Sequence, residues 1–211
     1  MIALLVGSVI GTLRTTPLPW VVRLGNAYVE IFRNVPLIVQ MFLWFFVVPE
    51  FLPKGLGDWI KQVPPPWGSY IPAVLCLGIY TSVRIAEQVK SGINSLARGQ
   101  RMAGTALGLT LTQTYRYVVL PQAFRIILPP LTSESMNIVK NSSVALTIGL
   151  LELTGRARAM QEFSFKVFEA FAAATVIYLL TNLLVVFAMR ALEKKVRVPG
   201  LISASAPAGG H

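Results

Sequence analysis

The sequence has few charged residues and almost none of the side chains that hold metals or form disulfides. Asp, Glu, Lys and Arg make up 13% of its 211 residues, about half the share in a soluble domain. One cysteine, Cys76, leaves no disulfide and no thiolate zinc site, and one histidine, His211, leaves almost no imidazole chemistry. Since no nucleophile–base set is visible either, we expect no metal, no bound cofactor and no enzyme activity.

Apolar residues and a basic excess are what the sequence does contain. Hydrophobic residues make up 54% of the chain, and 19 Lys and Arg against 9 Asp and Glu give a formal net charge of +10. A disordered chain would be less apolar, and a soluble nucleic-acid-binding domain would not be this hydrophobic. These features predict an integral membrane protein with no nucleic-acid partner.

Five apolar stretches are candidate membrane spans, since a helix needs about 20 mostly apolar residues to cross the hydrocarbon core. The first, Met1 to Leu13, is too short to cross alone. We interpret it as the second half of a span whose beginning is missing, through a misassigned start or a removed extension. The stretch at 122–151 contains two prolines and polar residues, so we expect it to be bent. The other three predicted spans are 28–52, 70–86 and 170–189.

The distribution of charge between these stretches predicts their orientation. The connections at about 14–33 and 90–125 and the end at 190–197 have a basic excess, whereas those at 50–69 and 152–169 are balanced. From Lys90 to Arg125 there are five basic residues and no acidic one. By the positive-inside rule, the chain has five transmembrane helices with its C-terminus in the cytoplasm. We expect one transmembrane domain over residues 1–199 and a disordered tail over 200–211.

The segment of about residues 93–121, here called the 93–121 loop, is much longer than a plain hairpin requires. We predict a short helix over 100–107, ended by Gly108 in a left-handed conformation. Thr110 or Thr112 then caps a second helix over 113–119, which Pro121 stops or kinks. Two short helices at an angle would form a protruding elbow. Taken alone, the loop is equally consistent with a basic amphipathic hairpin lying on anionic lipid.

The spacing within this loop resembles the EAA motif of bacterial ATP-binding-cassette importer permeases. That motif is Glu-Ala-Ala, three residues, Gly, nine residues, Ile, one residue, Leu-Pro. Here Gly108 matches the glycine, Val118 takes the isoleucine position, and Leu120 and Pro121 match the end. Met102-Ala103-Gly104 replaces Glu-Ala-Ala, which is a departure from the pattern. Stretches within 28–40, 86–100 and 129–142 resemble the polar amino-acid (histidine/glutamine) permease subfamily, and the resemblance covers about residues 20–199.

This resemblance implies an all-α membrane protein with the type I importer fold, located in the bacterial inner membrane. It also implies a multi-subunit importer, in which two permease subunits form the pathway, an ATPase pair docks on their coupling loops, and a periplasmic binding protein delivers substrate. The chain has no phosphate-binding loop, so ATP and Mg would be bound and ATP hydrolysed by the partner ATPase. The residues that the motif assigns to ATPase coupling are Ala103, Gly104, Ala106, Leu107, Gly108, Leu120 and Pro121.

The amino-acid sequence of residues 80–92 and 193–200 is most similar to that of glutamate/aspartate permeases. A permease of the same family for glutamine, histidine or another polar amino acid is the alternative. The alternatives from other classes are a self-contained secondary transporter and a lipid-binding membrane scaffold. A secondary transporter usually has more spans and an internal repeat, and a scaffold does not explain the spacing of Gly108 and Pro121.

Four polar residues within or directly beside the predicted spans are candidates for the substrate pathway. Arg84 and Glu87 share one helix face, where Arg84 could offer a bidentate fork to a substrate carboxylate. The alternatives are an Arg84–Glu87 ion pair or an Arg84 that reaches the headgroups. Asn137 and Asn141 share a face with Glu134 and are weaker candidates, since hydrogen bonding between two permease subunits would explain them equally well.

Overall fold

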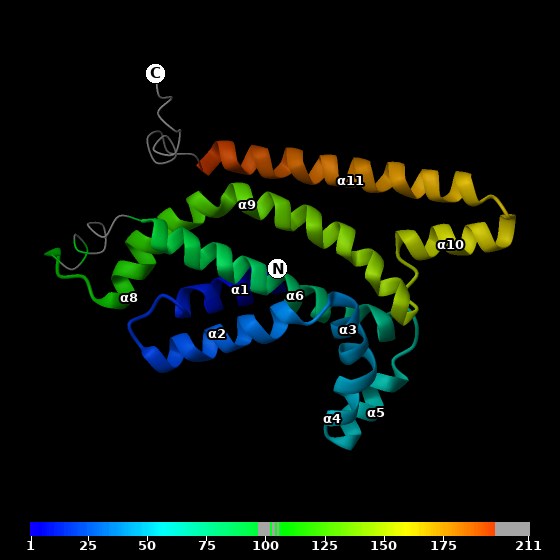
Figure 1. The fold of residues 1–211 in the computed structure, drawn as a ribbon, viewed down its shortest axis with the longest axis horizontal. Helices are drawn as coiled ribbons and strands as arrows, with labels where there is room; N and C mark the ends of the chain where they lie inside the picture. The colour runs from blue at the N-terminus through cyan, green and yellow to red at the C-terminus, as the bar shows by residue number, and fades with distance from the viewer. Residues whose placement is uncertain (97–101, 103, 105, 197–211) are drawn as a thin grey trace.

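The structure is a computed structural model, and it describes residues 1–96, 102, 104 and 106–196. Within these residues it consists of helices and their connections, with no strand. Figure 1 shows α1, α2, α6, α9 and α11 as rods with similar axes, while the short helices α3, α4 and α5 turn away from them. The predicted all-α fold is confirmed for the described part of the chain.

The helices are, in chain order, α1 (Ile2–Leu13), α2 (Pro19–Asn34), α3 (Leu37–Phe42), the π-helix η1 (Leu43–Val47), α4 (Val48–Phe51), α5 (Lys54–Gln62), α6 (Trp67–Ser95), α8 (Leu111–Thr114), the π-helix η2 (Tyr115–Val119), α9 (Leu120–Asn141), the 3₁₀-helix η3 (Ser142–Ile148), α10 (Leu153–Ser164) and α11 (Val167–Val196).

Two of these helices, α6 and α11, are each long and apolar enough to cross a membrane. They contain the predicted spans 70–86 and 170–189. A third candidate is the broken pair α2 plus Leu37–Phe51, whose halves meet at 102°. The prediction of one continuous span over 28–52 is therefore wrong. Val35 is extended (φ −94°, ψ 126°) because the following Pro36 disfavours helical geometry at the preceding residue.

The two remaining predicted spans correspond to α1 and to α9 with η3. Helix α1 has 12 residues, which matches the short stretch predicted at the N-terminus. Helix α9 runs through Pro129 and Pro130 without interruption and changes to a 3₁₀-helix at Ser142. Gly149, in the left-handed region at φ 78°, ends η3.

Helix α6 lies at the centre of the bundle and packs most closely against α1 (Figure 1). Two glycines on α1 make this approach possible. A Cβ atom built on Gly7 would lie 2.7 Å from the Ser82 carbonyl oxygen, and one built on Gly11 would lie 2.7 Å from that of Ala86. Small residues at such contacts let helix backbones come together and gain van der Waals contact. The same face of α6 then meets α9 through a shared apolar core that contains Ile93 and Ile127.

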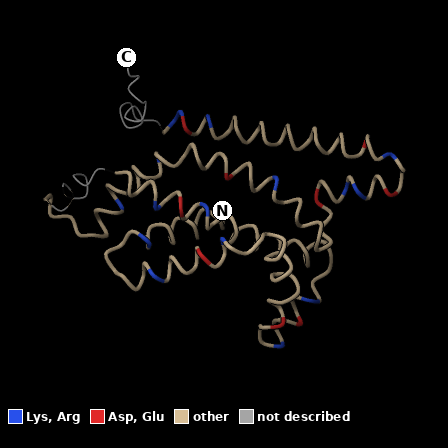
Figure 2. The backbone as a smooth tube through the Cα atoms, in the orientation of Figure 1, with Lys and Arg blue, Asp and Glu red and all other residues tan. Residues whose placement is uncertain are grey.

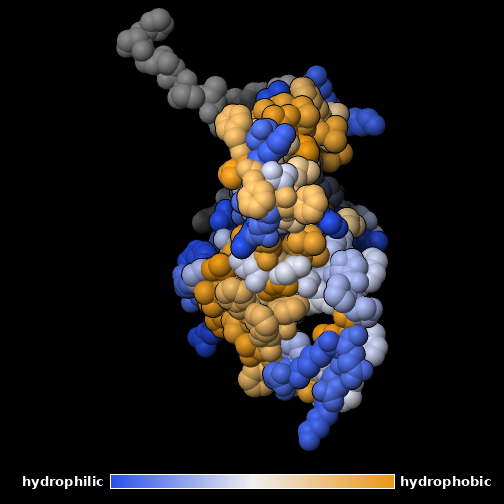
Figure 3. Space-filling model, turned by 90° about the vertical axis from the view of Figure 1, so that its right-hand side faces the viewer, coloured by the Kyte–Doolittle hydropathy of each residue, from blue (hydrophilic) through white to orange (hydrophobic). Residues whose placement is uncertain are grey.

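Helices α10 and α11 meet at a sharp corner. Phe165 ends α10 with a left-handed backbone (φ 59°), the one positive φ at a non-glycine residue among those described. Its side chain and that of Phe163 are exposed. Figure 3 looks onto this end of the molecule, where apolar and hydrophilic side chains lie side by side. The connection at 152–169, which the sequence marks only by its balanced charge, contains α10. Glu152 accepts hydrogen bonds from two N–H groups and caps this helix.

Candidate functional site: the 93–121 loop and the charges beside it

Gly108 adopts the left-handed conformation predicted for it, with φ 74°. The Leu109 N–H donates to the Gly104 carbonyl at 3.1 Å, a bond across five residues that is typical of a Schellman helix end. A side chain on Gly108 would meet no atom within 4 Å. The requirement for glycine is therefore conformational, since a Cβ atom is disfavoured at this φ wherever space is available.

Of the two predicted caps, Thr110 and not Thr112 caps the second helix of the loop. Its hydroxyl accepts from the Gln113 N–H at 3.3 Å, and the Gln113 side chain accepts from the Thr110 N–H at 2.9 Å. This reciprocal pair is a capping box, which fixes where the chain turns. Gly104 packs against the Thr114 side chain, where an added Cβ would lie 2.8 Å from its methyl group. The helix end at Gly108 is thus packed against the second helix, α8, through the contact between Gly104 and Thr114.

The predicted coupling residues fall into two groups. Ala106, Leu107 and Gly108 are exposed, with Leu107 at 79%, so an apolar side chain projects from the turn. Leu120 is half-buried and packs on the core that contains Val119. Ala103 lies outside the described residues.

Pro121 does not stop the second helix, which corrects that part of the prediction. The π-helix η2 lies directly before it, and α9 begins at Leu120 with Pro121 in its first turn. In a π-turn, the N–H bonds to the carbonyl five residues earlier, as the Leu120 N–H does to Tyr115. Since proline has no N–H to place in the helix ladder, the wider turn absorbs the disruption. The 93–121 loop therefore continues without a gap into α9.

Arg84 and Glu87 do not pair with each other, so the predicted alternative of an Arg84–Glu87 ion pair is wrong. Arg84 lies 3.9 Å from Glu134 of α9 and has its guanidinium 5.6 Å from the Tyr80 ring centre. Glu87 pairs instead with Arg14, 3.0 Å away, and Arg33, 3.8 Å away. The two residues share a helix face, but each is neutralised by a different neighbouring helix.

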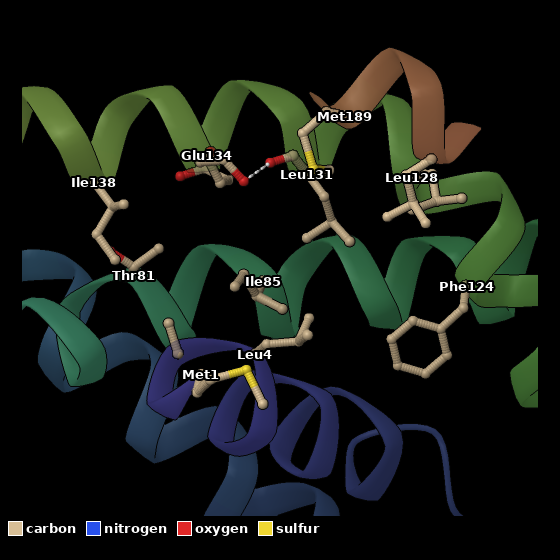
Figure 4. A pocket seen from close by; sticks show the side chains of 13 residues that line it. Met1, Leu4, Thr81, Ile85, Phe124, Leu128, Leu131, Glu134, Ile138 and Met189 are labelled. Atoms are coloured by element: carbon tan, nitrogen blue, oxygen red, sulfur yellow. Dashed lines mark hydrogen bonds between the residues drawn. The ribbon is translucent and has the colours of Figure 1, made fainter. Parts of the chain in front are cut away.

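Glu134 is the most buried acidic side chain of this group, with 9% exposure. It accepts a hydrogen bond from Gln88 at 3.5 Å, while its second carboxylate oxygen is buried without a partner. It lines a cavity of about 350 Å³ between α1, α6, α9 and α11, whose other lining residues are mostly apolar. Figure 4 shows Glu134 on α9 opposite Thr81 and Ile85 on α6. Glu134, which lines this cavity, is thus paired with an exposed cation, Arg84.

Asn137 and Asn141 are half-buried on α9, and within the described residues neither side chain has a hydrogen-bond partner. Lys140 beside them is exposed, whereas Glu134 is buried. Residues that the sequence interpretation missed are Arg14 and Asn26, which are hydrogen-bonded to each other at 2.8 Å. Arg14 was counted there only as a loop charge, because its burial depends on α2 folding back along α1.

Comparison with known proteins identifies the class of protein to which this arrangement belongs. Residues 3–198 match the family described as binding-protein-dependent transport system inner membrane component. The chain belongs to this family and is thus an inner-membrane component of a binding-protein-dependent transport system. Within the family it is similar to the glutamate/aspartate import permease protein GltJ of Escherichia coli K12, with 49% identity over 95% of this chain and 82% of GltJ.

More distant relatives align with this chain over most of its length. The probable glutamine permease protein GlnM of Bacillus subtilis is 32% identical over 90% of this chain and 82% of its own. A crystal structure of an amino acid ABC transporter with histidines superposes with a TM-score of 0.74 at 28% identity, covering 92% of this chain and 85% of that one. The MetNI methionine transporter shares the fold, with a TM-score of 0.73 at 19% identity over 93% and 88% of the two chains.

Proposed function

We propose that this chain is the permease subunit of an ATP-driven importer of glutamate and aspartate, and that Arg84 lies on its substrate path. The observation that carries the substrate assignment is the 49% identity to GltJ over nearly the whole chain. Relatives whose names specify glutamine are 31 to 33% identical.

The position of Arg84 supports an acidic substrate. Its side chain is 48% exposed and sits 3.9 Å from Glu134, so the guanidinium is only partly neutralised within the chain. Guanidinium groups bind carboxylates through two parallel hydrogen bonds. An amino acid with two carboxylates that enters an apolar path gains from such a cation, since a buried anion without a partner is costly. Glu87, Asn137 and Asn141 are proposed as further pathway residues.

The geometry of the 93–121 loop supports coupling to a separate ATPase. Gly108 and the Thr110 capping box build a defined turn that presents Leu107 outward, and such a knob suits a groove on a protein partner. The basic excess around the loop supports a cytoplasmic location, which also places the C-terminus in the cytoplasm. The complete importer would contain an ATPase pair that binds ATP and Mg, a second permease subunit and a periplasmic binding protein.

The test is reconstitution with the ATPase, second permease and binding protein encoded beside this gene. In proteoliposomes loaded with ATP and supplied with the binding protein, we expect uptake of labelled glutamate that unlabelled aspartate inhibits and glutamine does not. Uptake inhibited by glutamine or histidine but not by aspartate would contradict the proposed substrate and favour the alternative polar amino acids.

A further inference from the structure

Tyr115 connects the 93–121 loop to the N-terminal helix pair. It belongs to η2, and its side chain is buried in the core shared by α6 and α9. Its hydroxyl donates to the Thr15 backbone carbonyl at 2.7 Å and lies 3.3 Å from the Thr15 hydroxyl. This hydrogen bond joins residues 100 positions apart, directly after the segment that the Thr110 capping box fixes.

Arg14, which precedes Thr15, continues this connection into the helix bundle. Its side chain is 5% exposed and lies 3.0 Å from Glu87 of α6. Its Nε donates to the Asn26 side chain of α2 at 2.8 Å. Gly25 makes room for the arginine stem, since a Cβ there would lie 2.6 Å from the Arg14 Cγ. Any displacement of the Thr15 backbone therefore moves the backbone of an arginine bonded to two other helices.

A second cation, Arg33, lies near Glu87. Arg33, which is 59% exposed, lies 3.8 Å from the same carboxylate oxygen that Arg14 contacts at 3.0 Å. The Glu87 side chain is itself 40% exposed. If Arg14 moves away, Arg33 can therefore keep Glu87 neutralised, whereas the buried Arg14 loses its acidic partner. Glu87 thus keeps a cation when Arg14 moves away, and Arg14 keeps its hydrogen bond to Asn26.

We infer that Tyr115, Thr15 and Arg14 form a mechanical link that carries movement of the 93–121 loop to Glu87 on α6. This inference rests on the proposed function, because it takes the loop as the site where the ATPase acts. Tyr115, Thr15 and Arg14 are positioning residues, since they act through Glu87. When the loop moves, Tyr115 pulls on the Thr15 carbonyl, and Arg14 shifts relative to Glu87. Without the Tyr115 hydroxyl, less of the loop's movement reaches Arg14 and Glu87, although the apolar core still joins the loop to α6.

The test measures amino acid transported per ATP hydrolysed by the reconstituted complex. Tyr115→Phe removes the hydroxyl alone, so ATPase docking and ATPase activity should persist while this ratio falls about fivefold, the factor that corresponds to one hydrogen bond. The matched control is Tyr117→Phe. Tyr117 lies in the same π-helix, is 62% exposed and, within the described residues, has no hydrogen-bond partner for its hydroxyl. Its ratio should equal that of the wild type.

Two further variants sharpen this result. Thr15→Ala should leave the ratio near the wild-type value, because the main acceptor is a backbone carbonyl. Glu87→Gln should lower it, and adding Tyr115→Phe should lower it no further, because the residues act in one chain of contacts. A wild-type ratio in Tyr115→Phe would overturn the link, as would independent, multiplying effects of Tyr115→Phe and Glu87→Gln.

These outcomes are separable from a failure of the proposed substrate. If the wild-type complex imports a different amino acid, the ratio is measured with that amino acid and tests the link unchanged. All values are normalised to the amount of assembled complex, so poor folding of one variant does not imitate uncoupling.

Discussion

Helices α6 and α11 are almost equal in length, with 29 and 30 residues, yet they occupy different surroundings. In the most apolar part of α6, 56% of the residues are buried within the chain, against 11% in α11. Helix α6 carries Arg84 and Glu87 within its span, whereas the long middle of α11 has no charged residue, as Figure 2 shows.

The two helices also satisfy their polar groups differently. In α11, Thr175, Thr181 and Asn182 each donate to a carbonyl four residues earlier in the same helix. The exception is Tyr178, whose hydroxyl donates to Glu152 at the start of α10. In α6, Arg84 and Glu87 pair with side chains from other helices. A helix exposed to lipid has to satisfy its polar groups itself, while a helix inside a bundle can use them for interactions between moving parts. This contrast is consistent with the role proposed above for Arg84 and Glu87 on α6.

The largest expected effect is the loss of the α1–α6 contact. Gly11→Leu places a side chain 2.7 Å from Val89 and from the Ala86 carbonyl, where the backbone cannot yield. We expect destabilisation of about 3 kcal/mol, the upper range for overpacking, measured as a lower melting temperature in detergent. Ala173→Leu adds volume to an exposed position of α11 and should leave the melting temperature nearly unchanged. Equal effects would contradict the contrast between the two helices.

The next prediction concerns the charge on α6. Arg84→Ala should lower glutamate uptake about tenfold, since a charge-assisted hydrogen bond contributes roughly 1.5–3 kcal/mol. Because it also removes the cation beside the buried Glu134, uptake is normalised to the amount of folded protein. Arg84→Lys keeps the charge but loses the fork, so intermediate uptake is expected. The measurement is the initial rate of labelled uptake with glutamine as competitor. Unchanged uptake and selectivity in Arg84→Ala would remove Arg84 from the pathway.

A smaller energetic effect with a specific consequence is expected at Gly108. Gly108→Val forces a β-branched residue into φ 74°, at a cost of about 1–2 kcal/mol. The protein should still insert into the membrane but retain less ATPase on co-purification. Gly55→Val is the control, since Gly55 also has open space around it but no positive φ. Normal ATPase retention and transport by Gly108→Val would refute the elbow model of the 93–121 loop.

The smallest effect is expected at the α10–α11 corner. Phe165→Gly removes an exposed side chain from a left-handed residue, and we expect about 1 kcal/mol of stabilisation from the relieved strain. Phe163→Gly, near the end of α10 and equally exposed, should destabilise by about 0.5–1 kcal/mol because glycine weakens a helix. Detergent melting curves of the two variants check this prediction. A lower melting temperature in Phe165→Gly would show that its side chain makes a contact that outweighs the strain.

Local features of the fold could be read from the sequence because single residues impose them. Gly108 predicted its own positive φ, and Thr110 was one of the two predicted caps, since each acts on the backbone within a few positions. The apolar stretch 170–189 was equally clear, because hydropathy alone defines a lipid-exposed helix.

Features that depend on distant parts of the chain could not be read in this way. Pro121 predicted a stop, but the π-helix before it keeps the helix continuous. Arg84 and Glu87 are three residues apart and were candidates for an ion pair with each other. Glu87 instead forms its ion pair with Arg14, 73 positions away. Helix propensity and charge spacing carry no information about which helix packs beside which, so the partners of intramembrane charges require the tertiary structure.

The most direct test of the central claim is whether transport by this chain requires the separate ATPase. The measurement is glutamate uptake into proteoliposomes that contain either the full complex or the permease subunits alone, with and without ATP inside. We predict uptake against a gradient only with the ATPase, internal ATP and the binding protein together. Concentrative uptake by the permease subunits alone, driven by an ion gradient, would contradict the account and identify a secondary transporter instead.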